Sequence, residues 1–312
     1  MVSSEPDTSP LGSRLLPWAN LGAYVLNIVA TSVIGTSGKV GKTNSEVSAA
    51  YPTLFTPAGY AFSIWGLIFA MEGAFALYQL LPSVRSTPAI QKGVGPWWIL
   101  MVLLQLGWSL SFATESIPLS MFFMVGIFLS LLALTLSLRQ ALPRRPSLAQ
   151  SICLLLPFSL NFGWITAALL ANANILAVYR DSEDLASHLA TAVSSCVVLG
   201  LAALLGGFRL LDPIFCLVLV WAGTAIAKEL SAPVASISAS FPPPVTQGLS
   251  QAVFVLVGFA ALAALHAAGR RVLLRRGGGE DTQGEEKEGE SRQGDTGSPA
   301  GVRAAAQALL KP

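Results

Sequence analysis

Charged side chains are scarce in this sequence. Only 12% of its 312 residues are Asp, Glu, Lys or Arg, whereas a soluble globular domain carries about 25%. Apolar residues make up 53% of the chain, and the mean hydropathy is +0.62. The net charge is only +2, and no basic face is large enough to attract nucleic acid. The composition therefore excludes a soluble domain and predicts a polytopic membrane protein. Nucleic acid is not expected as a partner.

The side chains that usually carry catalysis or hold metals are also few. The two histidines, His188 and His266, lie near the ends of apolar segments, and Cys153, Cys196 and Cys216 are well separated within such segments. The sequence has no His/Cys cluster, no nucleophile elbow and no glycine-rich nucleotide-binding turn. We interpret the cysteines as small buried hydrophobic residues rather than as a disulfide or a metal site. We therefore expect neither an enzyme nor a bound cofactor.

The chain has instead a series of apolar segments long enough to cross a bilayer, which takes about 20 residues per helix. Strands are not expected, because no segment alternates polar and apolar residues with period two. The predicted fold class is all-α, a polytopic membrane helical bundle of about eight transmembrane helices. The predicted spans are Trp18–Thr36, Ala58–Leu81, Pro96–Thr114, Pro118–Leu138, Ser151–Val178, Leu189–Gly207, Leu211–Lys228 and Gly248–Ala268. The fifth is either one tilted helix or a helix with a polar break around Asn172 and Asn174.

Basic residues are distributed unevenly between the loops on the two sides of these spans. Eleven lie in the N-terminal tail, the even-numbered loops and the beginning of the C-terminal tail, against four on the opposite side. Positive charge marks the cytoplasmic side, so both termini are predicted to be cytoplasmic, with loop 37–57 facing the outside or a lumen. The predicted domains are a cytoplasmic N-tail (1–17), a transmembrane helical domain (18–268) and a cytoplasmic C-tail (269–312). The C-tail is expected to be disordered, because it has no apolar run from Gly277 to about Pro299.

One carboxylate lies deep within a predicted span. Glu72 is near the middle of Ala58–Leu81. Trp65 and Gln79 lie seven residues before and after it, so the three share one side of a helix. An acid at this depth is costly and is by default functional. The stripe is either a packed interhelical contact, with Glu72 protonated or hydrogen-bonded, or part of a ligand or transport site.

Polar and aromatic residues form similar stripes on four other predicted spans. By helical spacing, each of these sets shares one face: Asn20, Tyr24, Asn27 and Thr31; Trp98, Met101, Gln105, Trp108 and Phe112; Asn161, Trp164, Ala168 and Asn172; Trp221, Thr224 and Lys228. A single stripe is usual for helix packing. Five stripes at similar depth favour a shared interior cavity, because aromatic walls with a few polar anchors are what a ligand pocket needs. Pure packing seams remain the alternative.

Two motifs in the sequence resemble those of a known family. The run from Phe55 to Phe69, FTPAGYAFSIWGLIF, resembles the first-loop and second-helix signature of the TspO/MBR superfamily. The run PFSLNFGW, which ends at Trp164 and continues through Ala168 to Asn172, resembles the Trp…Ala…Asn face of that family's fifth helix. The chain is most similar to the larger proteins labelled tryptophan-rich sensory protein. The resemblance covers roughly residues 18–178.

This resemblance implies a site as well as a fold. It implies that the first five spans form a TspO-like bundle whose first loop covers a pocket, which in relatives accepts tetrapyrroles, sterols or similar flat apolar molecules. The last three spans have no counterpart in a five-helix protein. The implied pocket residues are Trp65, Trp108, Trp164, Ala168 and Asn172, with Phe55 and Pro57 in the lid. The polar stripes add Glu72, Gln105 and Asn161 to these candidates.

The predicted function is that of a membrane protein that binds, and translocates or senses, a flat hydrophobic ligand such as a tetrapyrrole. The alternative is a small-solute or proton-coupled transporter that uses Glu72 and Lys228 as a charge relay or coupling-ion site. A membrane enzyme or scaffold is a third reading. The expected partners are the lipid bilayer and a hydrophobic small molecule, and a homodimer is left open.

Overall fold

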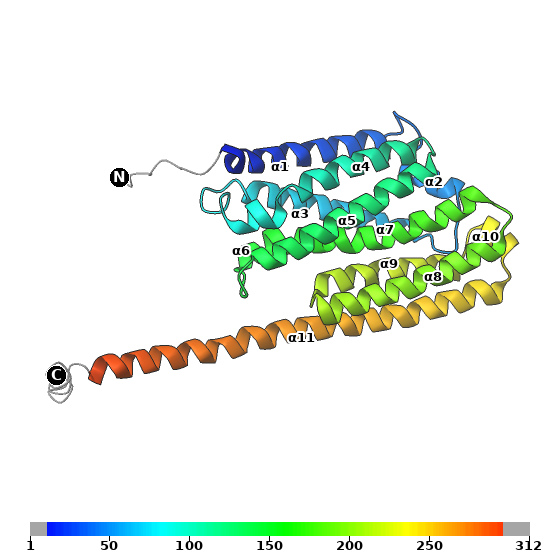
Figure 1. Ribbon diagram of the computed structural model, residues 1–312. Coiled ribbons are helices and arrows are strands. Elements are labelled where there is room, and N and C mark those ends of the chain that lie inside the picture. Colours follow the sequence, from blue (N-terminus) through cyan, green and yellow to red (C-terminus); the bar gives the residue numbers. More distant parts are fainter. Residues whose placement is uncertain (1–10, 296–312) are drawn as a thin grey trace, which may run out of the picture. The chain divides into compact units, whose positions relative to one another are not determined.

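The computed structural model describes the backbone of residues 11–295 and the side chains of residues 14–274. All regular structure within these residues is helical (Figure 1). The α-helices are α1 (Leu11–Ala30), α2 (Asn44–Ala50), α3 (Ile64–Tyr78), α4 (Trp97–Ala113), α5 (Ile117–Ala141), α6 (Leu148–Gln150), α7 (Leu156–Arg180), α8 (Leu185–Leu204), α9 (Pro213–Ser231), α10 (Ala235–Ser240) and α11 (Pro243–Asp295). Shorter π-helical and 3₁₀ turns extend them: η1 (Thr31–Thr36), η2 (Gly59–Ser63), η3 (Ala89–Val94), η4 (Ser151–Leu155) and η5 (Leu205–Arg209).

Eight described segments are long and apolar enough to cross a membrane. They are Arg14–Thr36, Gly59–Tyr78, Ala89–Ala113, Ile117–Ala141, Leu148–Arg180, Leu185–Arg209, Pro213–Ser231 and Pro243–Leu274. Each corresponds to one predicted span, with ends that differ by a few residues, so the predicted all-α fold with eight spans is confirmed. The largest extensions come from helical turns that precede or follow the apolar run, such as η3 before α4.

The fifth predicted span is one uninterrupted helix after its first turn. The turn η4 leads directly into α7, which continues through Asn172 and Asn174 without a break. The Asn174 side chain donates to Leu170 O of its own helix and to Ser195 Oγ of α8, both at 2.8 Å. Both bonds use the amide nitrogen as the donor, one to a carbonyl of α7 itself and one to α8, and the helix continues through this residue. The alternative of a polar break is therefore wrong.

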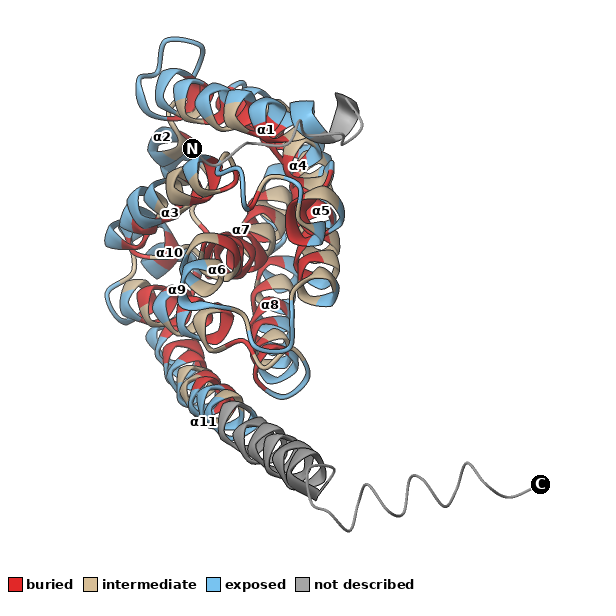
Figure 2. Cartoon of the chain, turned by 90° about the vertical axis from the view of Figure 1, so that its left-hand side faces the viewer, coloured by how far each residue is buried: buried red, intermediate tan, exposed pale blue. Residues whose placement is uncertain are grey.

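Helix α7 lies among the other helices of the bundle. It packs against α3 and α5 and also against α8 and α9, and it is the most buried of the eight spans (Figure 2). The outward faces of other spans carry large exposed apolar side chains, among them Val25, Phe122, Leu129 and Leu201. An apolar outer surface over helices of this length suits contact with lipid chains rather than water.

An ion pair between the buried Asp212 and the partly exposed Arg139 connects the α8–α9 turn to the first five spans. Asp212 caps α9, because its Oδ1 accepts from Phe215 N at 3.1 Å. Its Oδ2 accepts from Ser159 Oγ of α7 at 2.6 Å and pairs with Arg139 of α5. Arg139 Nη1 also donates to Leu210 O at 2.7 Å. Asp212 is buried and Arg139 is 22% exposed, so removal of Arg139 would leave a buried carboxylate without its cationic partner, and the cluster fixes the turn.

The described chain divides into two compact units at Ala267. The first contains α1 to α10 and the beginning of α11; in the second, the backbone of α11 remains helical to Asp295. This helix continues beyond Gly277, where the composition predicts a loss of structure, and residues 296–312 lie outside the described residues. Residues 1–10 of the predicted N-tail do so too, and α1 begins at Leu11. The predicted division into two tails and a membrane domain stays a prediction.

Candidate functional site

A cavity lies at the end of the first unit where α2 and α10 are found (Figure 1). It has two parts: an inner chamber of about 70 Å³ and an outer vestibule of about 700 Å³. Eight residues line both parts, so the parts adjoin through a shared neck. These neck residues are Asn44, Ser48, Thr56, Pro57, Phe62, Trp65, Gln105 and Trp108.

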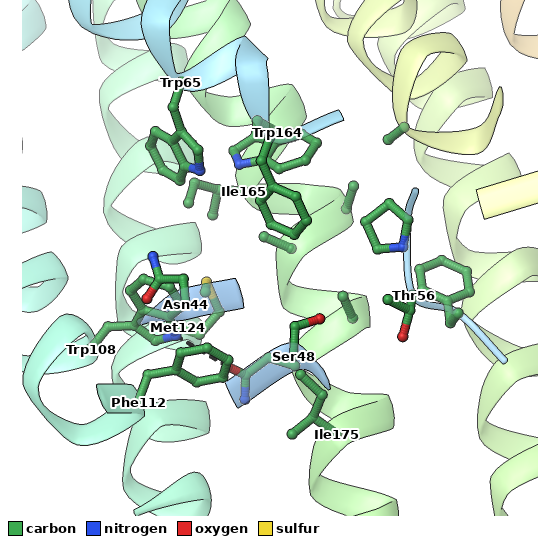
Figure 3. Close-up of a pocket in the computed structure, with 18 of the residues that line it drawn as sticks. Asn44, Ser48, Thr56, Trp65, Trp108, Phe112, Met124, Trp164, Ile165 and Ile175 are labelled. Carbon is green, nitrogen blue, oxygen red and sulfur yellow. Dashed lines mark hydrogen bonds between the residues drawn. The ribbon is translucent and has the colours of Figure 1, made fainter. Parts of the chain in front are cut away.

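Aromatic rings form two sides of the inner chamber (Figure 3). Trp65 of α3 and Trp164 of α7 lie together, with ring centroids 6.3 Å apart and planes at 83°. Across the space in Figure 3, Trp108 and Phe112 of α4 are stacked, with centroids 4.9 Å apart and planes at 18°. Edge-to-face and stacked arrangements are those that aromatic pairs favour, so both pairs present preformed ring surfaces to the chamber. Met124 of α5 adds a flexible apolar side chain to the lining, beside Trp108 (Figure 3).

The orientation of Trp108 is fixed by a chain of hydrogen bonds that joins three helices. Its Nε1 donates to Asn172 Oδ1 of α7 at 3.1 Å. Ser120 Oγ of α5 lies 3.3 Å from both the Oδ1 and the Nδ2 of Asn172. Met121 Sδ lies 3.7 Å from the same Nδ2. The amide of Asn172 is thus engaged by protein groups, so this residue lines the chamber mainly by positioning the Trp108 indole.

The short helix α2 covers one side of the neck. Its first turn is a capping box: Thr43 Oγ1 accepts from Glu46 N at 3.2 Å, and Glu46 Oε2 accepts from Thr43 N at 2.7 Å. This cap allows a helix of only seven residues to form. Asn44 and Ser48, on the helix so defined, face the cavity (Figure 3).

An ion pair attaches the start of α2 to the α4–α5 turn. Lys42 Nζ lies 2.8 Å from Glu115 Oε2, and Lys42 N donates to Ala113 O at 2.9 Å. The hydrogen bond from Lys42 lowers the pKa of Glu115, and the same bond raises the pKa of Lys42. Glu115 has a φ of 55°, in the left-handed region that commonly ends a helix.

The segment after α2 is held by α9, one of the three last spans. Ala58 N donates to Ala225 O at 3.1 Å, and Trp221 Nε1 donates to Ala61 O at 3.1 Å. The rings of Tyr60 and Trp221 meet edge to face, with centroids 5.2 Å apart. Lys228 Nζ lies 5.1 Å from the centre of the Tyr60 ring, within the range of a cation–π contact. The predicted lid is therefore attached to α9 as well as to α4.

Most of the ten candidate site residues meet at this cavity. Eight of them line the inner chamber: Phe55, Pro57, Trp65, Gln105, Trp108, Trp164, Ala168 and Asn172. Glu72 and Asn161 line neither part. They contact each other instead between α3 and α7, where Asn161 Nδ2 donates to Glu72 Oε1 at 2.7 Å. Glu72 is fully buried, so its stripe is at this point an interhelical contact.

Other residues of the polar stripes also form contacts between helices and do not line the cavity. Near the opposite end of the bundle, Asn20 Nδ2 donates to Gln79 Oε1 at 2.9 Å, and Trp98 Nε1 donates to Asn20 O at 3.1 Å. Tyr24 OH donates to Phe69 O at 3.1 Å. These contacts join α1, α3 and α4, so there the stripes are packing seams. The shared cavity occupies only the half of the bundle that faces α2.

Several lining residues carry no signal that the sequence reasoning used. Asn44 lies within the Thr43-x-x-Glu46 capping signature, which would have indicated α2, and Ser48 lies two residues after it. Met124 of α5 and Ile226 of α9 also line the chamber. Their spacing cannot identify them, because an apolar residue that faces a cavity and one that faces lipid look alike on a helix that is apolar all round.

A family model described as TSPO-like protein matches residues 17–264. The chain belongs to the TSPO-like protein family. Comparison with curated proteins gives no match. Comparison with solved structures gives none either.

In this TSPO-like protein the family match extends beyond residues 18–178, which the resemblance in the motifs covers. The sequence motifs lie within the first five spans, but the matched region continues through α8 and α9 and into α11. Helix α9, which contacts the predicted lid, is therefore part of the matched region. The protein is a TSPO-like integral membrane protein with several spans. Within the described residues, no group of three or more His, Cys, Asp or Glu side chains is placed to hold a metal ion.

Proposed function

We propose that this protein binds a flat hydrophobic molecule in the cavity below α2. The observation that carries the proposal is the pair of preformed aromatic surfaces, Trp65 with Trp164 and Trp108 with Phe112, on two sides of one chamber. Stacking on such rings contributes about 0.5–1.5 kcal/mol per pair beyond the buried area. Membership of the TSPO-like family supports the proposal, because a pocket of this kind is what the family resemblance implies.

The volumes of the two parts indicate how such a molecule would lie. Pockets for small molecules typically measure about 300–1,000 Å³. The vestibule, at about 700 Å³, falls in this range, and the inner chamber, at about 70 Å³, falls below it. We therefore expect the main ring system to lie in the vestibule and at the neck, against Trp65 and Trp108. Only a small apolar group would enter the chamber as far as Trp164.

A binding screen tests the proposal directly. The detergent-solubilised protein is titrated with tetrapyrroles, sterols and carotenoids, and tryptophan fluorescence is recorded. Three of the seven tryptophans line the cavity, so a ligand bound there should quench a saturable part of the emission. The matched control is a titration of N-acetyltryptophanamide in the same detergent. The proposal fails if no compound quenches the protein saturably beyond this control.

The side on which the cavity opens is part of the proposal. The four basic residues of the less basic side are Lys39, Lys42, Arg180 and Lys228, and this is the side of α2. The positive-inside rule therefore supports cytoplasmic termini and a cavity that opens to the outside or to a lumen.

Transport is a second candidate, favoured by one observation. Glu72 is a fully buried carboxyl group whose Oε2 has no hydrogen-bond partner among the described residues. Ionisable groups at such depth mark ion and proton pathways in transporters. The expected relay with Lys228 lacks support, because Lys228 Nζ lies over Tyr60 and no ion pair between it and Glu72 occurs in the described part. A proton-coupled transporter requires pH-dependent flux that Glu72→Gln abolishes.

A further inference from the structure

We infer that the ligand is a flat amphiphile whose polar end is neutral or positively charged and donates hydrogen bonds, rather than a dicarboxylate. This inference rests on the proposed function and narrows its ligand class. It follows from three features of the cavity: its charge, the position of nearby bases, and the polar atoms left without partners at the neck.

The charge of the cavity lining is negative. Glu229 is the one acidic residue among those that line the chamber and the vestibule. No Lys, Arg or His lines either part. Glu229, in the last turn of α9, is half-buried and forms no ion pair within the described residues. A carboxylate of this kind in a largely apolar hollow attracts a cation and repels a second anion.

The bases on this side of the protein do not compensate for Glu229. Lys228 precedes it in the chain, but its ammonium lies 5.1 Å from the centre of the Tyr60 ring, and neither residue lines the cavity. Lys42 is paired with Glu115 at 2.8 Å. Lys39 and Arg180 also lie outside the lining. A ligand carboxylate would therefore enter without a basic side chain in the lining to pair with it.

The neck offers hydrogen-bond acceptors that lack donors. Asn44 Oδ1 and Gln105 Oε1 are buried and have no hydrogen-bond partner in the described part of the protein. Both residues line the chamber and the vestibule, which places them where the two parts meet. Buried amide oxygens are normally satisfied, so an N–H or O–H group is the complement that the neck requires. A carboxylate would accept from the amide NH2 groups of these residues only, and it would leave both oxygens unpaired.

These features together define a ligand class. A flat ring system would lie against Trp65 and Trp108, its N–H or O–H groups would reach Asn44 and Gln105, and a cationic end would approach Glu229. Positive charge near the indole faces would add cation–π attraction. A tetrapyrrole with two propionates has the right ring but carries two negative charges, which this lining does not match.

The test compares ligands with one ring and different peripheral charge. The probes are a porphyrin with two carboxylates, its dimethyl ester, and its diamide with two diamines. The third probe therefore has two side chains that end in amines and is called the bis-amine below. Dissociation constants are measured on the solubilised protein by tryptophan quenching, with empty micelles as the blank. We expect the bis-amine to bind at least about tenfold more tightly than the dicarboxylate, since one favourable charge pair of 1.4 kcal/mol corresponds to that factor. The diester should lie between them.

A variant then assigns the charge preference to one side chain. Glu229→Gln should weaken the bis-amine severalfold and leave the diester unchanged. Glu183→Gln, which removes an exposed acid on the same side but outside the lining, should change neither. The inference is overturned if the dicarboxylate binds most tightly, or if Glu229→Gln leaves the preference for the bis-amine intact. If none of the three probes binds, the failure is that of the proposed function itself.

Discussion

Glu72 and Asn161 form a buried pair with one hydrogen bond between them. Asn161 Nδ2 donates to Glu72 Oε1, while Glu72 Oε2 and Asn161 Oδ1 lack partners among the described residues. Both unpartnered atoms are acceptors when the carboxyl group is ionised. A proton on Oε2 would supply a donor and remove a charge from the interior of the bundle. We therefore predict that Glu72 is neutral in the folded protein.

Two substitutions at Glu72 test this prediction. In Glu72→Gln, the amide Nε2 takes the place of the protonated oxygen, so the unfolding midpoint in detergent should stay close to that of the unmodified protein. Glu72→Ala leaves Asn161 unsatisfied and should cost about 1–3 kcal/mol, in addition to a cavity term. If Glu72→Gln destabilises the protein as much as Glu72→Ala, the carboxyl group is charged and the prediction is wrong.

Asn172 shows what resemblance and spacing could predict at a single residue. Both place it on the cavity face of α7, and it does line the chamber. Neither shows that its amide is already engaged by Trp108 and Ser120, because those partners come from α4 and α5. The role of a polar side chain in a bundle depends on the register between helices, and one sequence does not contain that register.

At the scale of elements, the apolar spans were predictable and the short helices were not. An apolar run of about 20 residues is a strong signal, because only a helix satisfies its backbone in lipid. Helices α2 and α10 have seven and six residues and depend on caps and tertiary contacts. The resemblance implies a lid that contains Phe55 and Pro57, and both residues line the chamber. It does not imply the attachment of this segment to α9 through Ala225 and Trp221, because those contacts join residues more than 150 positions apart.

The attachment of α2 to the α4–α5 turn should depend on pH. The pKa of Glu115 is lowered by its hydrogen bond with Lys42, so its contribution is present above its ordinary value of about 4.3 and is lost as the pH falls through the lowered value. The raised pKa of Lys42 keeps the partner charged up to strongly alkaline pH. The ion pair is therefore intact at neutral pH and breaks in acid.

Hydrogen exchange can detect this change. Protection factors, corrected for the intrinsic effect of pH, should fall over residues 38–46 below about pH 4. Lys42→Gln should show the low protection already at neutral pH, whereas Lys39→Gln should behave like the unmodified protein because Lys39 forms no ion pair with any described residue. Equal protection in both variants at neutral pH would show that the ion pair does not hold α2.

At the scale of the whole molecule, the orientation in the membrane remains a prediction. After replacement of the three native cysteines, a single cysteine at Ser45 of α2 should react with an impermeant reagent added outside sealed cells or vesicles. A cysteine at Arg144, which is exposed in the loop before α6, should react only after permeabilisation. The reverse pattern would place the termini outside and would contradict the orientation inferred from the basic residues.

The family assignment also shows where sequence motifs end and the fold continues. The two motifs lie between Phe55 and Asn172, but the family match extends to residue 264. In the structure, α9 supplies Ala222 and Ile226 to the chamber and Glu229 to the vestibule. Of the last three spans, α9 is thus part of the same cavity, a contribution that could not be read from the motifs because these residues have no distinctive pattern.

The most direct test of the proposed site is the affinity of Trp164→Ala compared with that of Trp18→Ala for the porphyrin dimethyl ester. Each substitution removes one of the seven tryptophans, but Trp164 lines the chamber and Trp18 is 61% exposed on α1. Trp164 closes the chamber and holds the Trp65 ring edge to face, with centroids 6.3 Å apart, so its loss frees the ring on which the ligand stacks, an interaction of about 0.5–1.5 kcal/mol. We predict that Trp164→Ala weakens binding at least severalfold and that Trp18→Ala leaves it unchanged. Equal affinities in the two variants would contradict a ligand site between these aromatic walls.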